Sequence, residues 1–516
     1  MTEDDLSTKP PAPFSIPHID TVEGRRTWRA MITHAPHVGT LINYIDARQK
    51  TSSERALRWY QRELFENRFF RIPSPVTACM IRSGDAITVT EKKSVCGHKT
   101  VFRFPDAPDL LLCASNLGEG FPLNTILMPS LRCGLNFGTR TWTIAPEEAE
   151  DAITIFAAEK WQPVRPAADV AAVCGDPNFA HMLWNQLPAL REAASLSQSR
   201  TPPPTIVTFF EPLGDIGLLT PEIAHWPVER STRYAMPNEP GRALFCFGST
   251  RIDPQTRATL HRSARDAIAT DAARVLSARL DGRRPIVWVS VRTRNRTPVN
   301  QHEFLTGLIA RLLATWPNAV VLLDGHSIAE DVRKRGAPLS ALLAENDCED
   351  LITQEDVKSR LTAARDAEEV AAIVRAVETE TPAYAERVID ASNLSILNSI
   401  ALAARADFYV CHHGSVQHKI GWTTTTPGVT HSNRRVIERR PAHWVMDQAG
   451  HDTAPVYFPE DLIVDVVDTA SVAQGDVDDN ARSLHSENYR FADVTATIDF
   501  TLEELARFHA QPPLRQ

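Results

Sequence analysis

The sequence lacks the patterns that mark several classes of protein. Its eight cysteines are widely spaced and form no Cys-x-x-Cys pair, which argues against a zinc ribbon and a disulfide framework. No run of about 18 apolar residues occurs, so no transmembrane helix is predicted. The first residues, MTEDDLSTKPPAP, are acidic and polar, unlike a signal peptide. These absences favour a cytoplasmic protein with reduced thiols and at most peripheral contact at the inner face of the membrane.

An excess of basic charge is also missing. The chain has 55 Lys and Arg against 64 Asp and Glu, which gives a formal net charge of −9. This balance gives no indication of a nucleic-acid partner. At 516 residues, of which 43% are hydrophobic, the chain has the composition of a globular protein with about two or three domains.

Strand and helix patterns alternate along most of the chain. We expect residues 1–22 to be disordered or extended because they are rich in proline. A first α/β domain is placed at 23–281, with a β-rich part at 75–145, and a second at 282–516 with a terminal helix. Strands that alternate with helices in two successive blocks predict an α/β fold with two Rossmann-like domains facing each other across a cleft.

The expected strands fall into three groups. Those of the β-rich part are 86–90, 100–104 and 139–144. Those of the two parallel blocks begin at Asp169, Thr205 and Arg242, and then at Ile286, Ala319 and Asp407. The strands of the second block are almost wholly apolar, as expected for a parallel sheet buried on both faces.

The stretch 392–422 joins an apolar helix, a short strand and a second helix. The strand predicted at 407–411 ends in His412-His413-Gly414-Ser415. In an open α/β sheet, ligands bind beyond the carboxyl ends of the strands. Glycine allows close approach to the backbone, and the amides of Ser415 and Val416 stand at the start of a helix. This turn is therefore suited to holding a diphosphate.

Adjacent histidines also raise the alternative of a metal site. Neighbouring side chains seldom point the same way, and no carboxylate stands nearby at ligand spacing, so we expect no metal here. One of the histidines can instead donate to a phosphate or sugar oxygen. The remaining alternative is an ordinary strand-to-helix turn without a ligand.

Three arginines alternate after the strand that begins at Ile286, in SVRTRNRTPVNQHEF. Alternation would place Arg292, Arg294 and Arg296 on one side of an extended loop. Planar guanidinium groups in such a position can bind phosphate in bidentate fashion. The alternative is a solvated basic loop. Because the run lies between a buried strand and a helix, we favour a diphosphate site.

Other polar residues near the same predicted edge are candidates for contacts to the sugar or nucleoside of a bound sugar nucleotide, the donor of the sugar. Asp324 follows the next strand and suits a hydroxyl group, although an Asp-Gly turn also forms without a ligand. Glu303 is equally well explained as a carboxylate that caps a helix. The full set of these candidates is Asp324, Asn300, Glu303, His412 and Gln417.

The last motif begins a helix in the first domain, in DPNFAHMLWNQLP at 176–188. His181 and Asn185 are four residues apart and should share a helix face. Trp184 can stack on a sugar, and we assign Trp184 and Asn185 to contacts with a molecule that carries an acceptor hydroxyl. An unperturbed histidine pKa of about 6.5 lets His181 accept a hydroxyl proton at neutral pH. Asp176 is a candidate to orient that imidazole; alternatively it begins the helix.

Three of these motifs resemble those of family 61-type glycosyltransferases. AHMLWNQLPAL resembles that family's GHFLxExLP-like helix start. VSVRTRNRTPVNQHEF resembles its strand that ends in Arg-x-x-x-Arg, and YVCHHGSVQHKIGW resembles its GxHGAxLTN turn. The motifs follow the family's order over residues 176–422. Cys411, Ser415 and Asn185 depart from the family pattern.

The resemblance implies a GT-B fold and inverting transfer of a sugar from a UDP- or GDP-sugar to a glycan or lipid-linked acceptor, with no required cofactor or metal. It implies His181 as the base, Arg292 and Arg296 as diphosphate ligands, and His413-Gly414-Ser415 as the donor turn. From the family alone we expect bacterial polysaccharide biosynthesis, and a homodimer stays open. The alternatives are a non-catalytic nucleotide- or carbohydrate-binding partner subunit and a fucosyltransferase-like enzyme.

Overall fold

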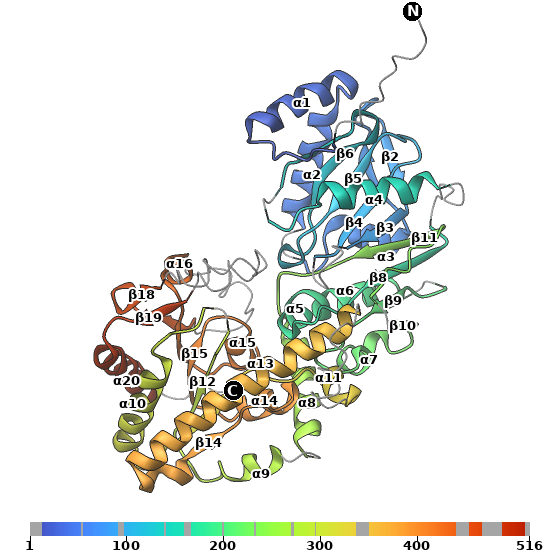
Figure 1. Cartoon of the computed structure of the whole chain (residues 1–516). Helices are drawn as coiled ribbons and strands as arrows, with labels where there is room; N and C mark the ends of the chain where they lie inside the picture. Colours follow the sequence, from blue (N-terminus) through green and yellow to red (C-terminus); the bar gives the residue numbers. More distant parts are fainter. Residues whose placement is uncertain are drawn as a thin grey trace, which may run out of the picture. The chain divides into compact units, whose positions relative to one another are not determined.

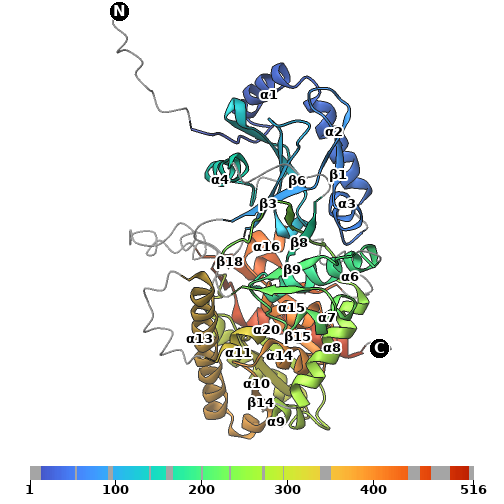
Figure 2. The same cartoon turned by 90° about the vertical axis from the view of Figure 1, so that its right-hand side faces the viewer.

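The structure is a computed structural model, and it describes residues 13–52, 55–90, 97–138, 141–158, 167–198, 201–231, 234–269, 273–294, 296–336, 350–439, 454–466 and 488–510. The chain divides into two compact units, each built on a β-sheet with helices against it (Figure 1 and Figure 2). The first unit comprises Met1–Asp176, Trp184–Phe210 and Pro221–Thr250, and the second comprises Pro177–Leu183, Glu211–Thr220 and Arg251–Gln516.

The units divide at Thr250 and Arg251, and the boundary expected at Asp281 lies inside the second unit. The reason is helix α8 (Pro254–Ala269), which packs on α14 (Ile396–Ala403) of that unit. The Asp281-Gly-Arg-Arg-Pro break marks the end of a helical region. The break does not indicate which of the two sheets helix α8 covers.

The second unit contains a doubly wound parallel sheet. Its strands are β12 (Ile286–Ser290), β13 (Val320–Asp324), β14 (Val388–Asp390), β15 (Phe408–His412), β16 (Gly428–His431) and β17 (Val456–Tyr457). They lie in the order β14-β13-β12-β15-β16-β17, and every pairing is parallel. Numbered along the chain, this is 3-2-1-4-5-6, the order of the Rossmann sheet. The prediction of a Rossmann-like second domain is confirmed.

Helices cover both faces of this sheet, which explains its apolar strands. Successive side chains of a strand point to opposite faces, so Val287 and Val289 join one core cluster and Trp288 the other. The first face packs against α10 (Gln301–Thr315), α13 (Leu351–Glu380) and α20 (Val494–Ala510), and the second against α8, α9 (Ala273–Ala278), α14 and α15 (Ser415–Gly421). Within the described residues, none of the helices has the length and apolar character that a membrane span requires.

The first unit contains a nine-stranded mixed sheet in the order β10-β9-β8-β11-β3-β4-β5-β6-β7. The strands β8 (Asp169–Val173), β9 (Thr205–Thr208), β10 (Val228–Arg230) and β11 (Arg242–Cys246) are parallel and lie in the Rossmann-like order 3-2-1-4. An antiparallel meander extends this sheet through β3 (Asp85–Val89), β4 (Lys99–Arg103), β5 (Leu111–Ala114), β6 (Leu123–Met128) and β7 (Cys133–Asn136). The fold is therefore α/β with two Rossmann-like units and a β-rich N-terminal part, as predicted.

The remaining elements of the described chain complete the two units. In the first unit these are α1 (Val22–His34), α2 (Val38–Thr51), α3 (Trp59–Asn67), β1 (Phe70–Pro73), β2 (Met80–Ser83), α4 (Pro146–Ala157) and α6 (Leu187–Leu196). In the second unit they are α5 (Phe179–His181), α7 (Ile216–Leu219), α11 (Glu330–Arg335), α16 (Arg434–Arg439), β18 (Ile463–Asp465) and β19 (Tyr489–Phe491).

Residues 13–18 run extended along the first sheet, and the strand expected at 139–144 was predicted wrongly where the structure describes it. Ser15 and His18 pair with the edge strand β7, and Phe14 is buried, so residues 13–18 are part of the first unit. Residues 1–12 lie outside the described part. The strand expected at 139–144 is absent from 141–144, while 139 and 140 are not described. The last strand of the meander is β7 instead, because its four residues are all buried against β6.

A cross-strand glycine provides a test of the second sheet. Gly428 lies opposite Tyr409, and a Cβ at Gly428 would lie 2.3–2.5 Å from three atoms of the buried Tyr409 ring. We predict that Gly428→Ala lowers the free energy of unfolding by about 1–3 kcal/mol, measured by urea denaturation. The control is Gly39→Ala in α2, where the nearest side chain would be 3.5 Å away and stability should hold or rise. Wild-type stability of the Gly428 variant would contradict this packing.

Candidate functional site

The predicted phosphate motifs lie at the carboxyl edge of the second sheet, at the point where the strand order reverses. β12 leads into Arg292–Arg296, and the adjacent strand β15 leads into His413-Gly414-Ser415. From β12 the sheet continues through β13 on one side, and from β15 it continues through β16 on the other. Open α/β sheets bind their ligands at such a switch point.

Two guanidinium groups converge on the backbone at Gly414. A Cβ at this position would lie 3.2 Å from Arg292 Nη1 and 3.5 Å from Arg296 Nη2. Gly414 also has a φ of +125°, a conformation that side chains disfavour. The structure thus brings together two motifs that are more than a hundred residues apart in the chain, and it places a pair of cations beside the buried backbone of Gly414.

Hydrogen bonds between the two strand ends hold the arginine loop in place. The His412 amide donates to Ser290 Oγ at 2.8 Å, and His412 Nε2 donates to the Arg296 carbonyl oxygen at 2.5 Å. Arg292 Nε donates to the Arg294 carbonyl oxygen at 2.8 Å, and Arg296 has a φ of +54°. The loop therefore turns back on itself, whereas we expected an extended run with three arginines on one side. Arg294 is exposed.

The electrostatics of the arginine pair favour an anion. Burial and the neighbouring charge of Arg296 lower the pKa of Arg292 to about 10, and the carboxylate of Asp366 opposes this shift. Arg292 remains charged at neutral pH, but its charge is less well solvated than that of a surface arginine. A phosphate group between the two guanidinium groups would offset both their mutual repulsion and the lost hydration.

The structure gives Asp324 a structural role instead of a contact to the donor. Asp324 is 1% exposed and forms an ion pair with the equally buried Lys419 of α15. Lys419 Nζ also donates to the Gly325 carbonyl oxygen at 2.6 Å and to Ser327 Oγ at 2.8 Å. Burial raises the pKa of Asp324, and Lys419 opposes the rise. The pair ties α15 to the end of β13.

Other predicted donor contacts are also taken up by the fold. Asn300 donates from Nδ2 to the Phe491 carbonyl oxygen and accepts from the Phe491 amide with Oδ1, both at 3.0 Å, which joins α10 to β19. Gln417 is fully buried and donates to the Tyr409 hydroxyl at 3.0 Å. Glu303 is exposed on the first turn of α10. None of these contacts indicates a ligand.

The residues of the donor turn differ in exposure. His412 and Val416 are buried, whereas His413 and Ser415 are half-buried. His413 Nδ1 lies 3.4 Å from the Tyr457 hydroxyl of β17. The helix that follows, α15, has only seven residues, so its dipole adds little beside two arginines. Anion binding at this turn would therefore depend mainly on Arg292 and Arg296.

The motif at 176–188 is divided between the two units. Asn178 caps α5, because its side chain accepts from the Ala180 amide at 3.1 Å, so Asp176 does not begin this helix. Asp176 is buried in the first unit. His181 is half-buried on α5, which belongs to the second unit and contacts α15. The helix that carries His181 thus lies beside the helix that follows Gly414.

A π-helical turn at Met182–Gln186 changes which residues share a face with His181. In a π turn the hydrogen-bonded partner is five residues away, so the i, i+4 argument for His181 and Asn185 does not apply. Asn185 is fully buried, and its Nδ2 donates to the Ser249 carbonyl oxygen at 2.5 Å. This contact holds the chain after β11 and leaves Asn185 poorly placed for an acceptor. Trp184 is half-buried and stays a candidate.

Two residues near the site, Asp366 on α13 and Tyr489 on β19, were not predicted from the sequence. Asp366 accepts hydrogen bonds from the loops after both β12 and β13. The Tyr489 hydroxyl bonds to His431 Nδ1 at 2.5 Å behind the arginine loop. A signal for Asp366 was available: it is an acidic residue on the apolar stripe of a long helix, with Ala363 and Val370 on the same buried face.

Comparisons with known proteins give only distant structural likeness. No protein-family model matches the sequence, and no curated protein matches it either. The α,α-trehalose 6-phosphate synthase of Burkholderia multivorans is 12% identical, with 70% of this chain and 75% of that chain covered and a TM-score of 0.27. The UDP-forming synthase of Burkholderia xenovorans in complex with glucose-6-phosphate is 11% identical, with coverages of 70% and 75% and a TM-score of 0.26. MnaA of S. aureus in a structure with UDP is 11% identical, with coverages of 74% and 84% and a TM-score of 0.22.

The buried histidines near the site are neutral. Burial lowers the pKa of His326 and of His431 to about 3, and it lowers the pKa of His412 well below 6.5. His412 can therefore donate from Nε2 to a carbonyl oxygen without adding a third positive charge beside the arginines. In the described part of the chain, no three or more His, Cys, Asp or Glu side chains are grouped so as to hold a metal ion.

These histidines predict that acid destabilises the second unit. They bind a proton less readily in the folded chain than in the unfolded chain, so their contribution to stability is present above pH 6.5 and lost as the pH falls toward 3. Each should cost about 1.4 kcal/mol per pH unit in that range. We expect His431→Gln to reduce the pH dependence of urea unfolding, with exposed His225→Gln as the control. Equal pH dependence of both variants would contradict the prediction.

Proposed function

We propose that this chain is a glycosyltransferase that moves a sugar from a nucleotide-sugar donor to a hydroxyl acceptor. The observation that supports this most strongly is the convergence of Arg292 and Arg296 on Gly414 at the switch point of a Rossmann-like sheet. Two Rossmann-like units in one chain are also the architecture of GT-B glycosyltransferases, the class that the sequence motifs resemble. The proposal rests on this geometry and those motifs, because the likeness to known structures is too weak to support it.

In the proposed reaction, the donor diphosphate lies between the two guanidinium groups and the backbone at Gly414. The acceptor oxygen forms a bond to the anomeric carbon while the bond from that carbon to the diphosphate oxygen breaks. The diphosphate leaves with the electron pair, and Arg292 and Arg296 stabilise the negative charge that grows on it. His181 takes the proton of the acceptor hydroxyl.

His181 remains our proposed base because α5 contacts α15 in the second unit. Its half-buried position keeps the imidazole partly accessible. Membership of family 61, inversion at the anomeric carbon, and a glycan or lipid-linked acceptor in polysaccharide biosynthesis are also proposals. So are a UDP- or GDP-sugar as the donor and peripheral contact with a membrane.

The arginines provide the first test of the proposed function. We expect Arg292→Ala and Arg296→Ala each to lower the turnover of sugar transfer by about 10²–10³-fold, as when a preorganised donor to a developing anion is removed. Arg292→Lys should restore little of the lost turnover, because an ammonium group cannot form the paired hydrogen bonds of a planar guanidinium group. Arg294→Ala is the matched control on the same loop, since this side chain is exposed.

The assay uses a panel of UDP-, GDP-, CMP- and dTDP-sugars, with thermal shift to identify the donor before transfer is measured. Loss of transfer in both arginine variants, with the melting temperature retained, is the expected result. Full activity in either variant would remove that arginine from the mechanism. Donor binding by the wild type without hydrolysis or transfer would support the alternative of a non-catalytic binding subunit.

His181 provides an independent test of the base. We predict that His181→Gln lowers turnover by about 10²–10⁴-fold while the affinity for the donor stays near that of the wild type. The acidic limb of the pH–rate profile should disappear in this variant, because it reports the protonation of the base. A variant that keeps this limb and most of its turnover would show that another group accepts the proton.

A further inference from the structure

A single carboxylate joins the two loops that end the central strands of the second sheet. Asp366 Oδ1 accepts from the Thr293 amide at 2.9 Å and from Thr293 Oγ1 at 2.6 Å. Its Oδ2 accepts from the His326 amide at 2.8 Å. Thr293 directly follows Arg292, and His326 follows the Asp324-Gly325 end of β13. One carboxylate thus accepts three hydrogen bonds at the carboxyl edge of the sheet, two from backbone amides and one from a hydroxyl group.

The surroundings of Asp366 leave it little freedom to move. Asp366 is 2% exposed, and a Cβ at Gly325 would lie 2.6 Å from the Asp366 Cβ. This close approach explains why position 325 is a glycine: the missing side chain leaves room for α13 to pack against the end of β13. A larger residue at position 325 would push the carboxylate away from both loops.

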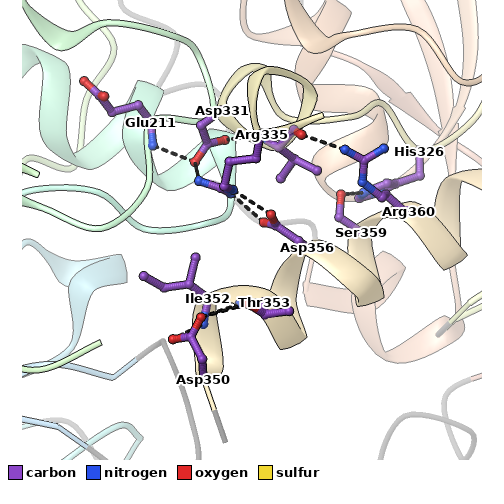
Figure 3. A network of polar contacts seen from close by, with 11 residues as sticks. Glu211, His326, Asp331, Arg335, Asp350, Ile352, Thr353, Asp356, Ser359 and Arg360 are labelled. Carbon is purple, nitrogen blue, oxygen red and sulfur yellow. Dashed lines mark hydrogen bonds and ion pairs between the residues drawn. The ribbon is translucent and has the colours of Figure 1, made fainter. Parts of the chain in front are cut away.

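Further polar contacts fix the N-terminal half of α13. His326 Nε2 lies 3.1 Å from Ser359 Oγ, and Arg335 of α11 donates to both oxygens of Asp356 at 2.6 and 2.5 Å (Figure 3). Asp356 and Asp366 both lie on the buried face of the helix. The C-terminal half of that face is apolar and packs in the core of the sheet. Polar contacts thus hold the N-terminal half of α13, and apolar packing holds its C-terminal half.

We infer that Asp366 is the positioning residue of the arginine loop: it holds Thr293 so that Arg292 is directed at Gly414 and ready to receive the diphosphate. This inference rests on the proposed function. Asp366 acts on the arginines through Thr293 in the backbone of the loop. Thr293 lies outside the regular strands, and its two hydrogen bonds to Asp366 link the loop to α13. A second link runs to α10, where Gln301 Oε1 accepts from the Arg292 amide at 2.9 Å.

The variant Asp366→Asn separates positioning from simple electrostatics. It removes a negative charge that lies near Arg292, so electrostatics alone predicts tighter binding of an anion. Positioning predicts weaker binding, because the amide NH₂ of Asn would face a backbone N–H at either Thr293 or His326, and a donor cannot accept. We expect the dissociation constant for inorganic pyrophosphate to rise about tenfold or more, as for loss of a buried hydrogen bond to a charged group.

The main readout is hydrogen exchange at the amides of Thr293 and His326, compared with Leu322 inside β13. We expect faster exchange in Asp366→Asn at Thr293 or His326, whichever amide faces the new NH₂ group, and unchanged exchange at Leu322. The matched control is Asp356→Asn, which breaks the Arg335 pair on the same helix face and should leave the Thr293 amide as in the wild type. Pyrophosphate titration of the same three proteins then links the loop to anion binding.

The outcomes are distinct for the two proposals. Unchanged exchange at both Thr293 and His326 in Asp366→Asn would overturn the positioning inference, whatever the ligand. Faster exchange with unchanged or tighter pyrophosphate binding would also overturn it, by showing a merely structural contact. A wild type that binds neither pyrophosphate nor any nucleoside diphosphate would overturn the proposed function, while the exchange data would still test the link between Asp366 and the loop.

Discussion

Two like charges held against one glycine are the interaction on which the site depends. Arg292 and Arg296 approach the position where any other residue would carry a Cβ, and burial together with their mutual repulsion lowers the pKa of Arg292. Such an arrangement is unfavourable without an anion, so the surrounding fold must hold it. It does so with neutral groups, including the imidazole of His412, and with a carboxylate that bonds to the loop backbone.

The order of the sheet explains why these groups meet. Strands β12 and β15 are neighbours in space, and the chain leaves them toward opposite sides of the sheet, so their loops face one another at the same edge. Polar side chains then tie the strand ends together. Ser290 accepts from the His412 amide, and Lys419 bonds to the end of β13. Several residues that the sequence suggested as ligand contacts instead form hydrogen bonds or ion pairs within the fold.

The fold of the second unit was largely predictable because its signal is local. Apolar strands and amphipathic helices alternate, and the strands expected to begin at Ile286, Ala319 and Asp407 correspond to β12, β13 and β15. The position of both phosphate motifs at one edge follows from the same pattern. Local sequence patterns do not reveal which group will bond to a buried polar side chain. Asp324 reads as a turn residue until Lys419 is seen beside it, and Asp366 lies 73 residues from Thr293. The π turn after His181 likewise has no periodic signature.

The most direct measurement of the central claim is a crystal structure of the protein with a nucleoside diphosphate bound. We predict that phosphate oxygens lie within hydrogen-bond distance of the guanidinium groups of both Arg292 and Arg296, over the backbone at Gly414. A diphosphate bound at another edge of the sheet, or one in contact with neither arginine, would contradict it.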